Sequence, residues 1–294
     1  MDVFRTPEDR FADLPGFPYE PRYREWEGMR LAHIDEGDGP VVMLMHGEPT
    51  WSFLWRKVIP PLLSAGYRVV APDLPGFGRS DKPTDIDWYT YDRHTAAIQD
   101  LVEQLDLSDV SVVVHDWGGP IGLRVATESP HRFARVAAMD TGVFTGSFKM
   151  SDNWQAFHDF VVATEDLPIG FLVKGAVARE MPDDVFAAYE APFPDPAAKA
   201  GARAFPPMIP RSEDTPDALT GQRVLEALTA SDWPKLVLWA DKDPVLPVKL
   251  GEAFAARIDA APPAIIEDAG HFLQEDAGEE IGRRLVDWLD ESRR

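Results

Sequence analysis

The chain has 294 residues, of which 45% are hydrophobic, so it can bury a large core as one domain or as a domain with an insertion. Its formal net charge of −21 argues against nucleic acid and anionic membranes as partners, because the long-range field repels both. It has no cysteine, which excludes disulfides, a thiolate nucleophile and a cysteine-ligated metal.

The first ten residues carry Asp2, Glu8 and Asp9, where a secretory signal would have basic residues followed by an apolar run. No apolar stretch approaches the roughly 18 residues that a membrane span needs. These features predict a cytoplasmic protein.

The acidic residues are spread along the whole chain, and the basic residues are mostly arginine. Such a surface is typical of proteins that work in high salt, where screening removes the self-repulsion of the charges. We therefore expect a halophilic origin, with an ordinary acidic bacterial protein as the alternative.

Short apolar runs rich in β-branched residues recur along the chain and predict buried strands of a parallel sheet. They are Pro40 to Met45, Tyr67 to Ala71, Val110 to Val114, Val136 to Met139, Leu236 to Trp239 and Ala264 to Ile266. The stretches that indicate helices are Trp51 to Ser64, Tyr91 to Leu105, Gly118 to Glu128 and Asp276 to Leu289. This alternation predicts an α/β fold with a mostly parallel sheet flanked by helices.

Between residues 146 and 221 the alternation breaks. Strand-like runs vanish, and prolines and aromatic residues become frequent, as in Ala191-Pro192-Phe193-Pro194-Asp195-Pro196. The simplest interpretation is a helical cap of residues 146–221 inserted into a core of residues 1–145 and 222–294. A separate C-terminal domain starting near Gly146 would leave the last two strands outside the sheet.

The pentapeptide His115-Asp116-Trp117-Gly118-Gly119 lies between a predicted strand and a predicted helix, where a sharp turn would expose a nucleophile. Asp116 stands at the position of that nucleophile. An aspartate can displace a leaving group at a saturated carbon and give an alkyl ester, which water then cleaves at its carbonyl. Asp116 therefore favours substrates that carry a halide or an epoxide.

A base and an orienting acid follow in the order that this fold imposes. His271 lies in Asp268-Ala269-Gly270-His271-Phe272, on a loop after the last predicted strand, where it could deprotonate water over an ester of Asp116. Two carboxylates follow other strands and could orient it. We favour Asp243, since Asp241 is better explained as a turn residue, and Asp140 is the alternative. The acid would hold the tautomer of His271 and stabilise its imidazolium form.

The segment His46-Gly47-Glu48-Pro49-Thr50-Trp51 follows another predicted strand and would face the turn at Asp116. The backbone N–H groups of Glu48 and Trp117 are then placed to stabilise the oxyanion that forms when water attacks the ester.

With these motifs, nearly the whole chain resembles an α/β-hydrolase, and more narrowly a haloalkane dehalogenase of the subfamily with two tryptophan halide ligands. The narrower resemblance depends on Glu48 combined with Trp117 and on the cap segment Ala191-Pro192-Phe193-Pro194-Asp195. The shared motifs also include Asp-Leu-Pro-Gly-Phe-Gly-Arg-Ser-Asp-Lys-Pro at 73–83. One departure is Val114, where serine hydrolases usually have glycine.

The resemblance implies hydrolysis of a haloalkane to a primary alcohol, halide and a proton, with no cofactor. It also implies that the halide lies between the indole N–H groups of Trp117 and a cap tryptophan, for which we choose Trp154, the only tryptophan in residues 146–221. Three cap phenylalanines could line the pocket, namely Phe157, Phe160 and Phe171. A sister subfamily places its acid where Asp140 stands, so the resemblance leaves the choice of acid open.

An epoxide hydrolase is the strongest alternative, but such enzymes usually assist ring opening with two cap tyrosines, and residues 146–221 contain only Tyr189. A fluoroacetate-type dehalogenase would need an arginine where Trp117 stands. A non-enzymatic binding protein would not need both a nucleophile and a base. No metal is expected, since the chain has no histidine cluster at ligand spacing. The expected partners are a small halogenated alkane and water.

Overall fold

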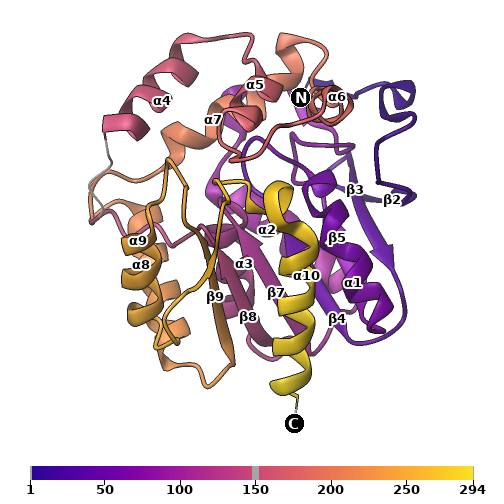
Figure 1. The fold of residues 1–294 in the computed structure, drawn as a ribbon. Coiled ribbons are helices and arrows are strands. Elements are labelled where there is room, and N and C mark those ends of the chain that lie inside the picture. Colours follow the sequence, from indigo (N-terminus) through magenta and orange to yellow (C-terminus); the bar gives the residue numbers. More distant parts are fainter. Residues whose placement is uncertain (1, 148–151, 294) are drawn as a thin grey trace.

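The computed structural model describes residues 2–147 and 152–293 and is built around a sheet of eight strands in the order β10-β9-β8-β7-β4-β5-β3-β2 (Figure 1). From β10 to β5 all neighbouring strands are parallel. These strands are β4 (Val41–Met45), β5 (Arg68–Pro72), β7 (Val110–His115), β8 (Phe133–Met139), β9 (Lys235–Ala240) and β10 (Ala264–Ile266). Each overlaps a run that the sequence predicts, and the predicted fold class is confirmed.

The sequence analysis missed an antiparallel hairpin at the other edge of the sheet. It consists of β2 (Arg22–Trp26) and β3 (Met29–Glu36), and β3 pairs antiparallel with β5. The residues between its strands, Glu27 and Gly28, both have positive φ, as a tight hairpin turn requires. β2 is mostly exposed and has no continuous apolar run, so it lacks the sequence pattern of a buried strand. A second small sheet pairs β1 (Val3–Phe4) with β6 (Lys82–Pro83).

Helices cover both faces of the large sheet (Figure 1). One face carries α1 (Ile59–Ser64), which follows a 3-10 helix over Ser52–Lys57, and α10 (Leu273–Glu291). The other face carries α2 (Tyr91–Gln104), α3 (Gly118–Glu128), α8 (Pro216–Ala230) and α9 (Val248–Arg257).

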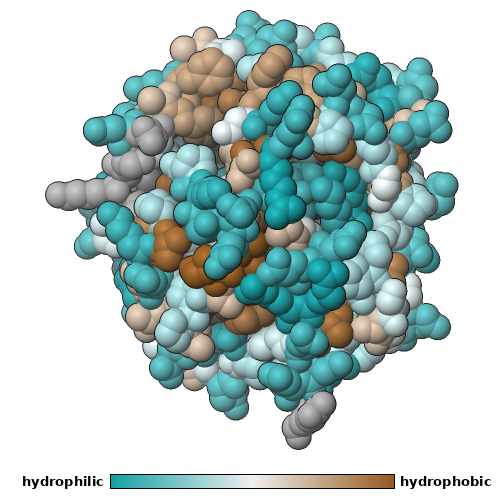
Figure 2. Space-filling model, in the orientation of Figure 1, coloured by the Kyte–Doolittle hydropathy of each residue, from teal (hydrophilic) through white to brown (hydrophobic). Residues whose placement is uncertain are grey.

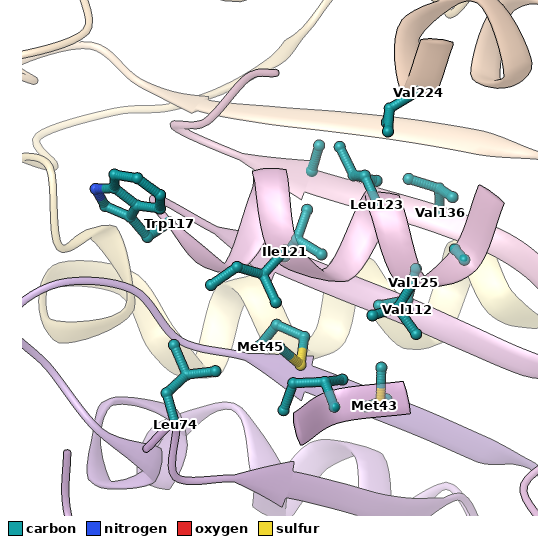
Figure 3. Close-up of a cluster of buried hydrophobic side chains, with 14 of the residues drawn as sticks. Met43, Met45, Leu74, Val112, Trp117, Ile121, Leu123, Val125, Val136 and Val224 are labelled. Atoms are coloured by element: carbon teal, nitrogen blue, oxygen red, sulfur yellow. The ribbon is translucent and has the colours of Figure 1, made fainter. Parts of the chain in front are cut away.

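The strand β7 is buried on both faces, which is why it is a continuous apolar run. Val112 and Val114 pack into the hydrophobic cluster under α3, while Val113 between them packs into the cluster under α1 and α10. Figure 3 shows the α3 side chains, among them Ile121, packed with residues of β4 and β7. The turn between β7 and α3 is therefore held by rigid elements on both sides.

Above the carboxyl ends of the strands lie the helices α4 (Asp152–Ala163), α5 (Ile169–Lys174), α6 (Asp183–Glu190) and α7 (Ala200–Met208) (Figure 1). The predicted cap range also contains residues 148–151, which lie outside the described residues. Helix α8 crosses the predicted boundary between residues 221 and 222 and packs on α3.

In the ranges that the structure describes, no helix has the length and apolar character that crossing a membrane would require. Figure 2 shows one face of the molecule, which is mostly hydrophilic, as the composition predicts, with smaller hydrophobic areas. In α4 and α5 the large exposed hydrophobic side chains are those of Phe160, Val162 and Phe171.

Candidate active site

Asp116 lies in a sharp turn at the point where β7 ends and α3 begins. Its φ is +48°, in the left-handed region that is unfavourable for most residues with a side chain. The turn also needs a glycine at position 119, where a Cβ atom would lie 1.8 Å from the hydroxyl oxygen of Thr141. That hydroxyl donates a hydrogen bond to the Asp116 carbonyl. Packing thus holds Asp116 in this unfavourable backbone conformation, in which its carboxylate faces the loops that carry Glu48 and His271.

One oxygen of the Asp116 carboxylate is held by the loop after β4. The backbone N–H of Glu48 donates to Asp116 Oδ1 over 2.7 Å, and the backbone N–H of Trp117 donates to the same carboxylate. The loop can come this close because residue 47 is glycine: a Cβ there would lie 2.1 Å from Asp116 Oδ1. The two N–H groups that the sequence predicts as oxyanion donors therefore both contact Asp116.

The Glu48 carboxyl is buried beside Asp116, and its Oε1 has no hydrogen-bond partner within the described residues. Burial and the negative charge of Asp116 raise the pKa of Glu48 well above its usual value. A neutral Glu48 adds no negative charge to the site.

The other oxygen of Asp116 faces His271, which lies between β10 and α10. His271 Nε2 is 3.5 Å from Asp116 Oδ2, and His271 Nδ1 is 2.7 Å from Asp243 Oδ2. The backbone of His271 is fixed as well, since the Nε2–H of His115 donates to its carbonyl over 2.8 Å. The imidazole thus stands between two carboxylates, with a different nitrogen toward each.

Asp243 and Asp140, the two acids that the sequence leaves open, occupy different places. Asp243 contacts His271 directly, and its Oδ1 accepts from the backbone N–H groups of Val245 (2.6 Å) and Leu246 (2.9 Å). Asp140 lies behind it, fully buried, and accepts from the backbone N–H of Ala240 over 3.2 Å. No hydrogen bond joins Asp140 to His271 among the described residues.

The charges of Asp116, His271 and Asp243, which lie in a row with His271 in the middle, act on one another. Burial alone would lower the pKa of His271, but the negative charges and hydrogen bonds of Asp243 and Asp116 raise it well above its usual value. Burial alone would raise the pKa of Asp116, but the hydrogen bond and charge of His271 lower it. Both shifts favour an ionised Asp116 beside a protonated His271.

Two neighbouring cavities have Asp116, Trp117 and Trp154 in their walls. The larger, of about 480 Å³, includes His271 and Glu48 in its wall. The smaller, of about 200 Å³, extends away from them between α8 and α9, and its wall is mainly apolar. Phe157 and Phe171 line the larger cavity, whereas Phe160, which the sequence analysis grouped with them, is exposed and lines neither.

The two tryptophans are held by different contacts. Trp117 packs edge-on against Phe144 and Phe205, each with ring centroids 4.5 Å apart, and in Figure 3 its indole nitrogen points away from the aliphatic side chains of α3. Trp154 of α4 packs against His158 at 5.3 Å, and the guanidinium of Arg211 lies 5.5 Å from its ring centroid. The sequence analysis missed the supporting residues Phe144, Phe205 and Arg211, because no local motif marks them.

Comparisons with known proteins find relatives over the whole length of the chain. A family model described as the alpha/beta hydrolase fold matches residues 40–192. The chain is 39% identical to a haloalkane dehalogenase of Psychrobacter cryohalolentis, with all of both chains covered. It is 42% identical to haloalkane dehalogenase 1 of Mycobacterium tuberculosis, covering 98% of this chain and 99% of the relative. The haloalkane dehalogenase DpaA of Paraglaciecola agarilytica, whose structure is described as tetrameric, superposes with a TM-score of 0.90 at 38% identity, covering 97% of each chain.

Proposed function

Since the chain belongs to the haloalkane dehalogenase family, whose members are hydrolases acting on carbon–halide bonds, we propose that Asp116, His271 and Asp243 carry this reaction. The observation that supports the proposal most directly is the row in which His271 lies between Asp116 and Asp243. The row supplies a nucleophile, a base and an acid that orients the base.

In the first step, Asp116 Oδ2 attacks the carbon that bears the halogen, and the carbon–halogen bond breaks. Asp116 Oδ1 keeps the hydrogen bond of the Glu48 backbone N–H, and the Trp117 backbone N–H stays on the same carboxyl. The halide leaves with the bonding electron pair and needs no proton. Indole N–H groups of Trp117 and Trp154 would stabilise it in an apolar pocket, and the positive charge of Arg211 beside Trp154 adds to that field.

In the second step, His271 Nε2 takes a proton from water, and the water oxygen attacks the carbonyl carbon of the Asp116 ester. The backbone N–H groups of Glu48 and Trp117 stabilise the oxyanion. Collapse of this intermediate expels the alkoxide, which takes the proton from His271 and leaves as the alcohol. Asp116 returns as a carboxylate, and the sum of both steps gives alcohol, halide and one proton.

Alkylation of Asp116 would itself prepare the base. The ester has no negative charge, so its formation removes one of the two charges that raise the pKa of His271. His271 could then lose its proton and act as a base only after the ester has formed. Asp116→Asn imitates this neutral state.

We expect the titration midpoint of His271 to lie at lower pH in Asp116→Asn than in the wild type, because a negative charge favours the imidazolium and its removal disfavours it. The measurement is the pH dependence of the imidazole carbon-bound proton signals by NMR. The His271→Gln variant assigns the signal among the seven histidines. An equal or higher midpoint in Asp116→Asn would contradict this role of the ester.

We propose residues 146–221 as the cap that encloses the site, with α8 shared between cap and core. Trp154, Phe157 and Phe171 all come from this range and line the cavities. Covering the site keeps bulk water from the halide and the ester.

Epoxide hydrolysis, the alternative, usually takes the proton for its alkoxide from two cap tyrosines, and such a pair does not face this site within the described residues. The hydroxyl of Tyr189 is buried and donates to Glu275, next to Arg56, away from the nucleophile. Within the described residues, no tyrosine lines either cavity. An epoxide alkoxide would therefore have no phenol to protonate it.

The two cavities favour separate places for water and for the alkyl chain of the substrate. Water must reach the ester beside His271, in the wall of the larger cavity, so a long alkyl chain interferes least if it extends into the smaller one. The smaller cavity suits such a chain because Leu225, Leu250 and Phe254 line it. We propose that 1-haloalkanes with long chains bind in this way.

We expect Leu250→Trp, which narrows the smaller cavity, to raise the KM for 1-bromohexane about tenfold, the effect of leaving two methylene groups unburied. The KM for 1,2-dibromoethane should change little, since that molecule does not reach Leu250. Leu172→Trp, which introduces the same side chain in the larger cavity, is the matched control and should not raise the KM for 1-bromohexane selectively. If Leu250→Trp changes the KM of both substrates equally, the long alkyl chain does not bind in the smaller cavity.

The proposed function is tested by bromide release from 1-bromobutane and 1,2-dibromoethane, with Asp116→Ala as the blank. We expect the wild type to release bromide and Asp116→Ala to release none. Bromide release by Asp116→Ala would show that Asp116 is not the nucleophile.

We propose a halophilic origin from the acidic composition, which predicts higher activity in molar salt than in low salt. Repeating the assay at both salt concentrations tests it. We also propose a cytoplasmic location, which neutral haloalkanes can reach because they cross bilayers unaided, and cell fractionation checks it.

A further inference from the structure

A second carboxyl lies directly behind the acid of the proposed triad. Asp140 follows β8 and Asp243 follows β9, and since these strands are parallel neighbours, their carboxyl ends meet at the same edge of the sheet. Asp140 is fully buried, has a φ of +36°, and its carboxyl makes a hydrogen-bonding contact with that of Asp243. Its only other polar contact among the described residues is the backbone N–H of Ala240.

Two buried carboxyls in contact cannot both be ionised at low cost, so they share a proton. The hydrogen bonds show which carboxyl holds it. Asp243 accepts from three N–H groups, those of Val245, Leu246 and His271, whereas Asp140 accepts from one. N–H donors stabilise the ionised form, so the negative charge belongs on Asp243 and the proton on Asp140.

We propose that Asp140 is a positioning residue, which remains protonated and donates its O–H to Asp243, so that Asp243 stays ionised and aligned on His271. The inference rests on the proposed function, in which Asp243 orients the base. The additional donor makes Asp243 a weaker competitor for the proton of the imidazolium, so the proton stays on His271 until the alkoxide leaves.

The electrostatics agree with this assignment. Burial and the negative charge of Asp243 raise the pKa of Asp140 well above its usual value, and the positive charge of His271 only partly opposes them. For Asp243, burial is outweighed by the charge and hydrogen bond of His271 and by the two backbone N–H groups, so its pKa is lowered. Asp243 and His271 are the titratable groups that act on Asp140.

Asparagine at position 140 tests the proposal, because its amide can make both bonds of a protonated aspartate. The N–H₂ donates to Asp243, and the oxygen accepts from Ala240. Asp140→Asn should therefore keep kcat within about threefold of the wild type. Asp140→Leu, of similar size but without a donor, should lower kcat about 10- to 100-fold, the range expected for one hydrogen bond to a charged group. The lost rate should lie in ester hydrolysis, so Asp140→Leu accumulates the Asp116 ester and its kcat–pH profile shifts.

Thermal unfolding gives a readout that does not depend on activity. A carboxyl whose pKa is raised on folding costs stability above its unfolded pKa, since the unfolded chain gains the ionised form. Asp140→Asn removes this cost. Its Tm should exceed that of the wild type at pH 8, and the difference should shrink as the pH falls toward 4. A difference infrared spectrum, wild type minus Asp140→Asn, should contain the C=O band of a protonated carboxylic acid.

If Asp140→Asn is as inactive as Asp140→Leu, or if the infrared band is absent, Asp140 is ionised and the proposal is wrong. If Asp140→Leu has wild-type kcat and pH profile, Asp140 does not position Asp243. Failure of the proposed function is recognised separately, by bromide release that persists in Asp116→Ala.

Discussion

A His271→Gln variant is expected to release one bromide per active site from 1,2-dibromoethane and then to stop. Ionised Asp116 can still displace the halide, because this step needs no proton transfer. The ester then persists, since no base activates water, and kcat should fall by at least about 10³-fold. Rapid mixing measures the single release of bromide, and mass spectrometry locates the alkyl group on the peptide that contains Asp116.

The matched control is the double variant Asp116→Ala, His271→Gln, which should show neither the single release nor the adduct. Sustained turnover by His271→Gln would mean that another group activates water. A single release with an adduct on a different peptide would mean that the nucleophile is not Asp116.

An Asp243→Asn variant is expected to lose on the order of 10⁴-fold in kcat, the loss seen when the acid of a comparable triad becomes an amide. Asp243 Oδ2 accepts the hydrogen bond of His271 Nδ1 over 2.7 Å, and this bond fixes the tautomer whose Nε2 faces Asp116. An amide N–H₂ at that place would favour the opposite tautomer. Because the defect affects water activation, the first release of bromide should survive, and the ester should accumulate as in His271→Gln.

Asp241→Asn is the matched control. Asp241 lies two residues away and accepts only from the backbone N–H of Ala269 (3.2 Å) among the described contacts, outside the row of His271. Its kcat should remain close to that of the wild type. An active Asp243→Asn together with an inactive Asp140→Asn would move the role of the acid to Asp140, the alternative that the sequence leaves open.

The pKa values of Asp116, His271 and Asp243 depend on one another's charges, so in the proposed reaction a change of charge on one of them shifts the pKa of its neighbours. Esterification of Asp116 leaves His271 with only Asp243 as an ionised partner. A protonated Asp140 would then add a donor to that remaining carboxylate without adding charge. The loss of the Asp116 charge would thus make His271 available as a base at the step that needs one.

The sequence by itself determined the features that depend on neighbours along the chain. The alternation of apolar runs and helices predicts the parallel sheet. The glycines at 118 and 119 beside Asp116 predict the sharp turn, and the loop at 46–51 predicts the backbone donors that the structure brings to Asp116. These are local signals, since a turn, a strand and a helix start are each specified within a few residues.

Only the tertiary structure decided the contacts between distant segments. Asp140 and Asp243 both follow neighbouring strands, and nothing in either local sequence states which one reaches His271; the backbone of the loop after β9, which turns its N–H groups of Val245 and Leu246 onto Asp243, makes the difference. The support of Trp154 by Arg211 and the two cavities likewise depend on side-chain packing across the fold. Such contacts join residues far apart in sequence, so no periodicity or motif encodes them, and they form only when the whole chain packs.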